Sequence, residues 1–277
     1  MRDVARRVVM PRYRRLGAGE VVEKTPGELV TVVDREAEAR LTDGLTAILP
    51  DARVVGEEAC AVNPGLLDGL DRGAAWIVDP LDGTGNFAAG AGAFGIIVGL
   101  VVDGETRAGW LHDPVRGRMC HAARGRGAFV DGAPLRVRRR GGAPVATLAT
   151  QFMAPAVREA LTDRAARRFR LRPIPRCAAE HYPQLCLGEV DVALFQRTLP
   201  WDHAAGALLL EEAGGRVARW DGSPYRVGDD GRGLLATTDA ALWDEAAAVL
   251  LVDPTVRQAE LRPQALPPLT VRPVAGR

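Results

Sequence analysis

Two aspartates and a glycine-rich turn follow a short apolar run in the first third of the chain. The run Trp76–Val78 is typical of a buried strand, and the following Asp79-Pro80 pair predicts that the strand ends there, because proline has no amide donor. Asp82 and the Gly-Thr-Gly segment 83–85 come next. Mg²⁺ prefers carboxylate and phosphate oxygens, and glycine-rich backbone offers N–H groups to phosphate. The stretch indicates metal ligands and an anion cradle within one turn, with an ordinary acidic surface turn as the alternative.

Other acidic residues stand at the predicted ends of helices and strands. Asp34 begins a helix predicted over residues 34–48, either as its N-cap or as a carboxylate that faces the metal site. Glu57 and Glu58 lie on a predicted surface loop after a short apolar strand, and we expect one to point inward and the other outward. Asp202 opens an alanine-rich helix, where an acid also stabilises the first turn. Each residue alone therefore has an ordinary structural explanation.

Taken together, four segments of the chain resemble the signatures of the inositol monophosphatase family of Mg²⁺-dependent, lithium-sensitive sugar phosphatases. The segments are Leu29-Val30-Thr31 to Asp34, Gly56-Glu57-Glu58, Asp79 to Phe87, and Trp201 to Gly206. They occur in the family's order and span most of the chain. The resemblance implies a mixed α+β and α/β fold, a layered α-β-α-β-α sandwich of the sugar phosphatase type, with the site between its two halves. It also implies a homodimer.

The resemblance assigns the metal ligands residue by residue. Glu57, Asp79 and the carbonyl oxygen of Leu81 are expected to bind the first Mg²⁺. Asp79, as a bridging ligand, Asp82 and Asp202 are expected to bind the second. Glu57 is also a candidate for holding a weaker third ion through water. Two ions about 4 Å apart can clamp the attacking and leaving oxygens of a phosphate ester in line.

The resemblance also assigns the residues that handle phosphate and water. The N–H groups of Gly83 and Thr84 are expected to hold the phosphate. The Thr84 hydroxyl, oriented by Asp34, is expected to position and activate the attacking water, with no covalent enzyme intermediate. Lys24 is the only lysine among 36 basic residues and lies near the position of a family lysine. It is expected to balance carboxylates or touch phosphate, unless it is a surface lysine.

The segment that faces the leaving alcohol departs from the family pattern. Inositol-cleaving members have a sugar-contacting glutamate seven residues before the aspartate of Trp-Asp, and here that position is Phe195. The family's Gly-Ser/Thr-Ala segment becomes Arg176-Cys177-Ala178, which makes Arg176, Ala178 and Phe195 the candidate substrate-pocket residues. Myo-inositol 1-phosphate is therefore in doubt. A second anionic group, as in a bisphosphate nucleotide or sugar bisphosphate, would suit Arg176 or Arg197; histidinol phosphate and plain surface arginines are the alternatives.

The chain divides into two predicted halves and a tail. Residues 1–140 are expected to form an antiparallel α+β half with most metal ligands, residues 141–252 an α/β half, and residues 253–277 an extended or disordered tail. Residues 1–16 have helical spacing, and Pro11 is expected to kink this helix or to divide it into two short helices. The arginine-rich run 136–142 marks the boundary between the two halves. It is expected to be a solvated linker, with a nucleic-acid-binding patch as the alternative.

The predicted elements follow from apolar periodicity and turn signals. In the first half, strands are predicted at 93–102, 106–111, 117–122 and 127–130, with Asp-Gly hairpin turns at 103–104 and 131–132. In the second half, strands at 145–149, 171–174, 191–195, 216–218 and 234–237 alternate with helices at 154–168, 179–187, 202–213 and 240–251.

Composition narrows the classes of function. A net charge of +1 gives no overall field that favours nucleic acid or membrane, and no apolar run reaches the roughly 18 residues of a transmembrane helix. The N-terminus lacks the apolar core of a secretory signal, and four scattered cysteines are expected to be reduced in a cytoplasm. We expect a phosphomonoesterase for a small phosphorylated polyol, sugar or nucleotide. The alternatives are a histidinol-phosphate or 3′,5′-bisphosphate nucleotide phosphatase, or a non-catalytic protein associated with RNA and transcription.

Overall fold

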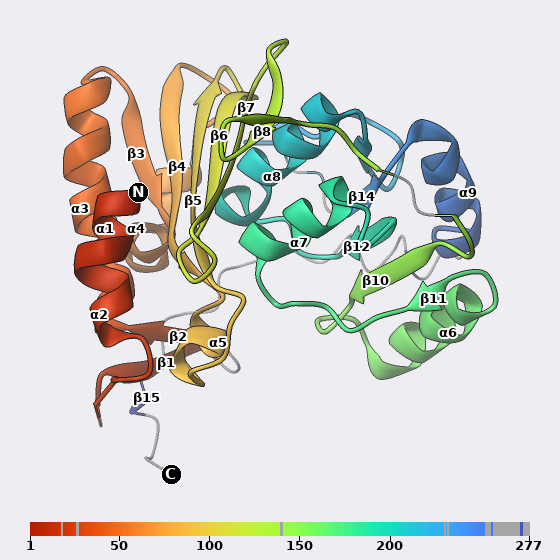
Figure 1. Ribbon diagram of the computed structural model, residues 1–277, viewed down its shortest axis with the longest axis horizontal. Helices are drawn as coiled ribbons and strands as arrows, with labels where there is room; N and C mark the ends of the chain where they lie inside the picture. The colour runs from red at the N-terminus through yellow and green to blue at the C-terminus, as the bar shows by residue number, and fades with distance from the viewer. Residues whose placement is uncertain are drawn as a thin grey trace.

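Helices and sheets alternate through the molecule in the order helix, sheet, helix, sheet, helix (Figure 1). This computed structural model describes residues 1–17, 19–25, 28–138, 141–229, 231, 233–252, 256 and 272–273. The predicted α-β-α-β-α sandwich of mixed α+β class is confirmed. Of the tail predicted over 253–277, all but Val256 and residues 272–273 lie outside the described residues, as do residues 139–140 of the arginine-rich run.

The first helical layer covers the outer face of the first sheet. It contains α1 (Arg2–Val4), a π-helical turn (Ala5–Val9), α2 (Met10–Arg12) and α3 (Val32–Ile48). The backbone stays helical through these first three segments, with the π-helical turn just before Pro11, so the expected division into two short helices is wrong. The helix ends at Arg12 and does not reach residue 16. Below this layer, β1 (Val21–Thr25) pairs antiparallel with β2 (Glu28–Thr31) and with β15 (Arg272–Pro273).

The first sheet is an antiparallel meander with one parallel strand at its edge. Its seven described strands lie in chain order: β3 (Arg53–Gly56), β4 (Ala74–Asp82), β5 (Gly95–Val102), β6 (Glu105–Asp113), β7 (Arg118–Ala123), β8 (Gly127–Val130) and β9 (Ala133–Leu135). Only β3 and β4 are parallel among these neighbours. Both predicted Asp-Gly turns are present, with left-handed φ at Asp103 and Asp131 and at the glycine after each. Strand β9 was not predicted, because it has only three residues.

The second sheet is mixed. Its order in the described residues is β11 (Arg170–Leu171), β10 (Val145–Ala149), β12 (Val192–Phe195), β14 (Leu234–Thr237) and β13 (Arg216–Arg219). Strand β10 is parallel to both neighbours, whereas β14 is antiparallel to both of its own. The strand predicted at 171–174 is wrong beyond Leu171, because this edge segment makes only a two-residue pairing with β10.

Helices cover both faces of the second sheet. Helices α6 (Pro155–Ala166) and α9 (Ala240–Leu250) pack on its outer face around Leu161 and Trp243. Helices α7 (Ala178–Cys186) and α8 (Pro200–Ala213) lie between the two sheets (Figure 1). Three short helices belong to the first half: α4 (Glu57–Val62), the 3₁₀ turn η2 (Pro64–Leu67) and α5 (Thr84–Ala88). No helix within the described residues combines the length and apolar character that a membrane crossing requires.

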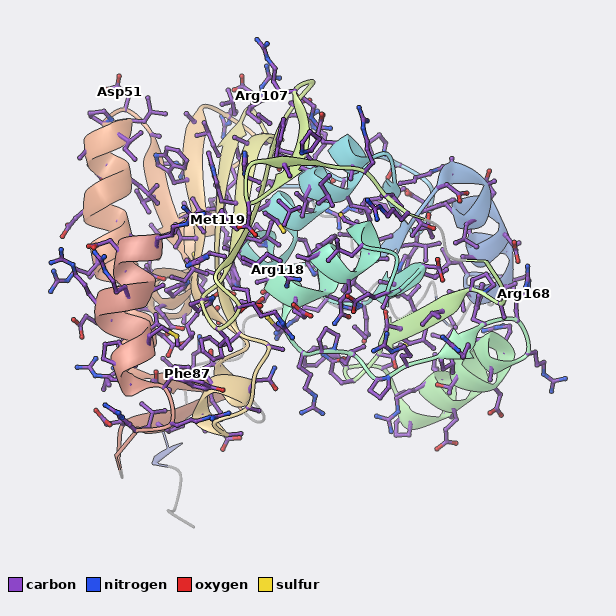
Figure 2. All side chains as sticks on the ribbon, viewed as in Figure 1. Asp51, Phe87, Arg107, Arg118, Met119 and Arg168 are labelled. Carbon is purple, nitrogen blue, oxygen red and sulfur yellow. The ribbon has the colours of Figure 1, made fainter. Side chains whose placement is uncertain are left out.

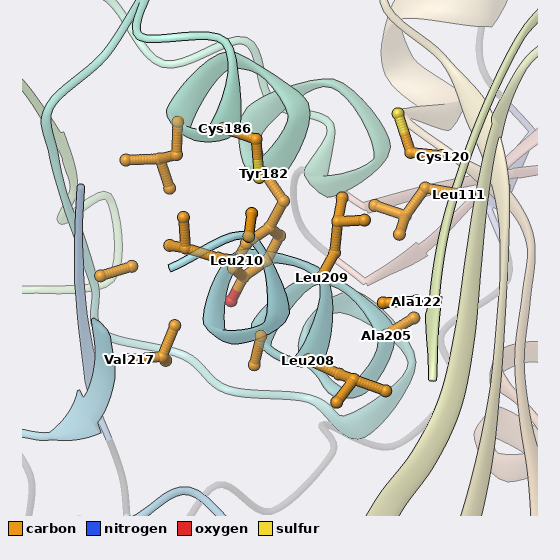
Figure 3. Close-up of a cluster of buried hydrophobic side chains, with 14 of the residues drawn as sticks. Leu111, Cys120, Ala122, Tyr182, Cys186, Ala205, Leu208, Leu209, Leu210 and Val217 are labelled. Atoms are coloured by element: carbon orange, nitrogen blue, oxygen red, sulfur yellow. The ribbon is translucent and has the colours of Figure 1, made fainter. Parts of the chain in front are cut away.

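Small residues let α8 approach its neighbours closely. A Cβ added to Gly109 on β6 would lie 2.8 Å from the Cβ of Ala205, and one added to Gly206 would lie 2.0 Å from the Tyr182 ring on α7. Figure 3 shows Tyr182 and the α8 side chains packed together between the sheet and Val217. The Ala-Ala-Gly part of the second signature therefore fixes the position of α8, and with it the position of Asp202 in the first turn of that helix.

Candidate active site

Three carboxylates gather where β4 ends beside the start of α8. Asp79, Asp82 and Asp202 each offer an oxygen, and these oxygens lie within 4.8 Å of one another. The sequence predicted that β4 would stop at Asp79-Pro80, and this is wrong, since the strand continues to Asp82. Its pairing with β5 is irregular between Asp79 and Asp82, and the Leu81 N–H donates to Asp79 Oδ1 at 3.0 Å instead of joining the ladder. This irregular strand end brings two aspartates to one site.

Asp82 is held from the α7 side. Its Oδ2 accepts hydrogen bonds from the Ala179 N–H at 2.6 Å and from the Cys177 thiol at 3.1 Å. Burial raises the pKa of Asp82 to about 6 in spite of these donors. Burial and the Asp82 carboxylate raise the pKa of Cys177 well above its usual range, so the thiol stays a donor. The contacts of Oδ2 fix the orientation of the carboxylate.

Helix α7 is itself anchored to the first sheet. Glu180 accepts hydrogen bonds from Arg118 of β7 and from Arg116, and it is buried. Figure 2 shows Arg118 between the first sheet and α7. This ion pair ties the first turn of α7, which carries Ala179, to the sheet that carries Asp82.

The electrostatics of the cluster favour a bound cation. Burial, followed by the charges of Glu57, Asp82 and Asp202, raises the pKa of Asp79 well above its ordinary value. Several carboxylates so close together repel each other unless a positive charge neutralises them. The donors are all oxygens, which suits a hard divalent cation such as Mg²⁺. The residues present therefore fit the metal that the sequence predicted.

Asp34 and Thr84 form a hydrogen-bonded pair beside the cluster. The Thr84 hydroxyl lies 2.9 Å from Asp34 Oδ1 and 2.9 Å from the Leu81 carbonyl oxygen. The interpretation of Asp34 as the N-cap of α3 is wrong. Thr31 is the N-cap, and Asp34 is the third helical residue, which accepts from the Thr31 N–H at 2.8 Å to complete a capping box. Burial raises the pKa of Asp34 to about 6, although the hydrogen bonds from Thr31 lower it.

The turn between β4 and α5 needs a glycine. Gly83 has φ of +82°, and a Cβ there would lie 2.7 Å from the Ala93 carbonyl oxygen. The Asn86 side-chain amide donates to that same carbonyl at 2.7 Å and to the Pro175 carbonyl at 2.9 Å. Asn86 therefore ties the Gly83-Thr84 turn to the loop before α7.

Glu57 begins α4 and contacts Lys24, a contact that sequence reasoning left open. Lys24 Nζ donates to Glu57 Oε1 at 2.7 Å and to Glu58 Oε1 at 2.5 Å. The reading of Glu57 and Glu58 as a surface loop is wrong, because Gly56 caps a short helix there. Glu38 accepts from the N–H of Glu58 at 2.8 Å, and a Cβ on Gly56 would strike the Glu38 carboxylate.

Lys24 is buried, so the alternative prediction of a surface lysine is wrong. Its side chain is 5% exposed, against 8% for Glu58 and 25% for Glu57. The expectation that one glutamate points outward is also wrong for Glu58, since Lys24 compensates its charge inside the protein. Burial lowers the pKa of Lys24, but Glu57 and Glu58 raise it by more, so the ammonium stays charged.

Phe195, a predicted substrate-pocket residue, has aromatic surroundings. Phe195 is 5% exposed and packs on the rings of His181, Tyr182 and His203. His181 in turn contacts the Thr147 hydroxyl at 2.7 Å. A buried phenyl group cannot accept a hydrogen bond from a substrate hydroxyl group.

Arg176 and Ala178 lie on either side of Cys177. Ala178 is the first residue of α7 and is half-buried, whereas Arg176 is exposed and has φ of +52°. The other candidate arginine, Arg197, has its guanidinium 4.5 Å from the Phe152 ring centre. The structure therefore places Arg176, and not the Arg197 guanidinium, directly in the loop that touches Asp82.

Sequence reasoning missed the residues that hold the predicted ones in place. Cys177 and Ala179 contact Asp82, and Asn86 of α5 contacts Pro175, but nothing in their spacing signals a long-range contact. The Thr31-x-x-Asp34 pattern could have been found, because it is the usual spacing of a capping box.

Comparison with known proteins identifies the family. Residues 2–253 match the model of the Inositol monophosphatase family. A fructose-1,6-bisphosphatase/inositol-1-monophosphatase of Thermotoga maritima is 33% identical over 208 residues, covering 74% of this chain and 78% of its own. The Nus factor SuhB of Escherichia coli K12 is 32% identical over 220 residues, covering 78% and 80%. The solved structure of a Thermotoga maritima IMPase superposes with a TM-score of 0.77 at 28% identity, covering 94% of this chain and 96% of that one.

The chain belongs to the inositol monophosphatase family. This is a family of metal-dependent phosphatases, and the Asp79, Asp82 and Asp202 cluster gives this member a group that could hold a metal ion.

Proposed function

We propose that the protein is a Mg²⁺-dependent phosphomonoesterase that hydrolyses a small phosphorylated polyol, sugar or nucleotide. One observation carries the proposal: the buried cluster of Asp79, Asp82 and Asp202 lies beside the hydrogen-bonded pair of Thr84 and Asp34. The cluster provides the ligands and the pair provides a path for a proton, which are the two requirements of hydrolysis by activated water.

The ligand assignment is the one that the family resemblance implies, and the cluster of Asp79, Asp82 and Asp202 supports part of it. Asp79, Asp82 and Asp202 would hold one ion, and Glu57, Asp79 and the Leu81 carbonyl a second, with a third weaker ion near Glu57. When bound, the cations would neutralise charge on the phosphoryl group and acidify water. Lys24 compensates part of the negative charge of Glu57, and its hydrogen bond fixes the orientation of the Glu57 carboxylate.

Thr84 and Asp34 act together on the water. The Thr84 hydroxyl has one proton and two acceptors at equal distance, Asp34 Oδ1 and the Leu81 carbonyl oxygen. When it donates to Asp34, its oxygen can accept a hydrogen bond from an attacking water molecule, and it can take a proton from that water as its own proton passes to Asp34 Oδ1. Asp34 is anchored through its other oxygen by Thr31, so it can orient the hydroxyl. The backbone N–H groups of Gly83 and Thr84 would hold the phosphate.

Phosphate release from a substrate panel tests this function. The panel contains inositol 1-phosphate, fructose 1,6-bisphosphate, adenosine 3′,5′-bisphosphate and histidinol phosphate, each with Mg²⁺ and with chelator. We expect Mg²⁺-dependent release from at least one substrate. No release from any of them, with Mg²⁺ bound to the protein, would contradict the proposed activity for this substrate class.

A second candidate function is non-catalytic association with RNA and the transcription machinery, which the likeness to a protein named Nus factor SuhB favours. The arginine-rich run that begins at Arg136 is the segment that would contact RNA. Retention of RNA that weakens with salt, together with no phosphatase activity, would favour this candidate.

We propose that the protein works in the cytoplasm as a homodimer, with residues 1–140 and 141–252 as its two halves. The four cysteines, which are buried and form no disulfide, are compatible with a reducing compartment. Light scattering at micromolar concentration would distinguish a dimer from a monomer.

A further inference from the structure

Arg176 has a backbone conformation that disfavours arginine. Its φ of +52° is in the left-handed region, where a side chain with a Cβ collides with its own backbone. Four other described non-glycine residues have such φ: Asp103 and Asp131, which belong to Asp-Gly hairpin turns, and Arg14 and Ala93, which do not. Arg176 is in no such turn. Strained residues of this kind concentrate at functional sites, so the conformation is one indication that Arg176 has a function.

Both neighbours of Arg176 touch the candidate active site. The Pro175 carbonyl accepts the Asn86 amide at 2.9 Å, and Cys177 donates to Asp82. A Cβ on Gly83 would lie only 3.2 Å from the Cβ of Cys177. Arg176 is therefore set between two contacts to the β4–α5 turn, at the side where the alcohol of a bound phosphate ester would leave.

The Arg176 guanidinium is available for a ligand. Within the part of the chain that the structure describes, it forms no ion pair or side-chain hydrogen bond, and the residue is exposed. The arginines that pair with Glu180 of α7 are engaged: Arg118 pairs with Glu180, and Arg116 pairs with Asp113 and Glu180. A cation without an ion pair, in the loop that contacts Asp82, is suited to an anion.

The rest of the alcohol side offers little to a neutral polyol. Phe195, where the family pattern has a glutamate, is buried among aromatic rings and cannot accept a hydroxyl hydrogen bond. Loss of a carboxylate and gain of a guanidinium change the charge on this side by two units in the positive direction. The change favours a leaving group that carries negative charge.

We propose that Arg176 binds a second phosphate group of the substrate, on the leaving-alcohol side, and so makes bisphosphates the preferred substrates. This proposal rests on the phosphatase function proposed above. The chemistry at the scissile phosphate stays with the carboxylate cluster, and Arg176 acts only in binding.

The test compares matched substrates on the wild type and on Arg176→Gly. The substrate pairs are fructose 1,6-bisphosphate with fructose 1-phosphate, and adenosine 3′,5′-bisphosphate with adenosine 3′-phosphate. Glycine adopts left-handed φ readily, so the variant should fold with a Tm equal to or above that of the wild type. The matched control is Arg126→Gly, which removes the same charge from an exposed turn at the opposite end of the first sheet.

We expect the wild type to prefer the bisphosphate of at least one pair by about tenfold in kcat/KM, a free-energy difference of about 1.4 kcal/mol. Arg176→Gly should abolish this preference through a higher KM for the bisphosphate, with kcat/KM for the monophosphate unchanged. Arg126→Gly should leave the preference intact. The bisphosphate rate should also fall more steeply with ionic strength in the wild type than in Arg176→Gly, because salt screens an exposed charge pair.

Equal kcat/KM for both members of each pair, or a preference that survives in Arg176→Gly, would overturn the proposal while the phosphatase function stands. A parallel loss on bisphosphate and monophosphate would also overturn it, since it would assign Arg176 a structural role. If the wild type hydrolyses neither member of either pair but another phosphate ester, the bisphosphate preference is wrong and the phosphatase class is right. Hydrolysis of no ester at all would refute the proposed function itself.

Discussion

The metal side and the alcohol side of the candidate site are built in different ways. On the metal side, carboxylates from β4 and α8 converge, and hydrogen bonds from Ala179 and Cys177 fix Asp82. On the proposed alcohol side, Phe195 is a buried phenyl ring, and Arg176 has left-handed φ and no ion pair within the described part of the chain. The metal side holds carboxylates that repel one another, whereas the proposed alcohol side has a phenyl ring and a guanidinium group.

The difference separates what determines the reaction from what determines the substrate. Close carboxylates destabilise the metal-free fold, so their presence is best explained by a bound cation. The alcohol side carries no comparable constraint from the chemistry. Substitutions there can change the preferred leaving group without affecting the attack on phosphorus, and the predictions below test this separation.

The largest effect is expected for a metal ligand. Asp82→Asn should lower kcat/KM by about 10³-fold, comparable with the loss of a charge-stabilising group in other active sites. The amide oxygen can still accept from Ala179, so the fold should survive. Phosphate release with saturating Mg²⁺ measures the loss.

Asp191→Asn is the matched control for Asp82→Asn. Asp191 is also buried and also accepts a backbone N–H, from Val145 at 2.8 Å, but it lies outside the carboxylate cluster. Its variant should keep wild-type kcat/KM. Equal losses in the two variants would mean that Asp82 is merely structural.

A smaller effect is expected at the water-activating pair. Thr84→Ala should lower kcat by about 10²-fold with a smaller change in KM, in the range of a lost general base. Thr84→Ser keeps the hydroxyl beside Asp34 and should retain most of the activity. If serine is no better than alanine, the hydroxyl has no part in the chemistry.

The link between the two sides should matter less. Asn86→Ala removes both hydrogen bonds from α5, to Ala93 and Pro175, and should lower kcat/KM by about tenfold through poorer alignment. Asn63→Ala, in an exposed turn, removes one local hydrogen bond and should leave kcat/KM unchanged. An unaffected Asn86→Ala enzyme would show that the two sides are positioned independently.

The smallest effect concerns stability alone. Burial lowers the pKa of His181 from 6.5 to about 3. The unfolded chain therefore binds the extra proton first, and this histidine's contribution to stability is full above pH 6.5 and is lost as the pH falls toward 3. Between pH 7 and pH 5 the loss should be roughly 2 kcal/mol.

Urea unfolding in chelator at several pH values measures this contribution. His181→Gln lacks the titrating group, so the wild type should lose stability relative to the variant as the pH falls. A wild type and variant with parallel pH profiles would mean that His181 protonates freely in the folded protein.

The sequence predicted the layered fold because its signals were local. Asp-Gly pairs at 103–104 and 131–132 predicted the hairpins, and apolar runs predicted strands such as β10 and β14 within a residue. It placed the end of β4 wrongly, because Pro80 stops one hydrogen bond and not the strand, whose pairing with β5 resumes at Asp82. The strand propensity of a segment contains no information about its pairing with a strand that is distant in the sequence.

The candidate site was predictable only where a motif carried it. Asp79, Asp82 and Asp202 were found through two signatures, and the structure brings them together. The contacts of Lys24 with Glu58, and of Asn86 with Pro175, join segments far apart in the chain and leave no local signal. The left-handed φ of Arg176 is equally invisible, because arginine gives no hint of a conformation that glycine would suggest.

The most direct test follows phosphate release and Tm together, for wild type and Asp79→Asn, with Mg²⁺ and with chelator. We predict wild-type release only with Mg²⁺ and no release from Asp79→Asn. In chelator, Asp79→Asn should have the higher Tm, because it removes a buried carboxylate that Glu57, Asp82 and Asp202 repel. Phosphate release by the wild type in chelator, or undiminished release by Asp79→Asn, would contradict the role of this cluster.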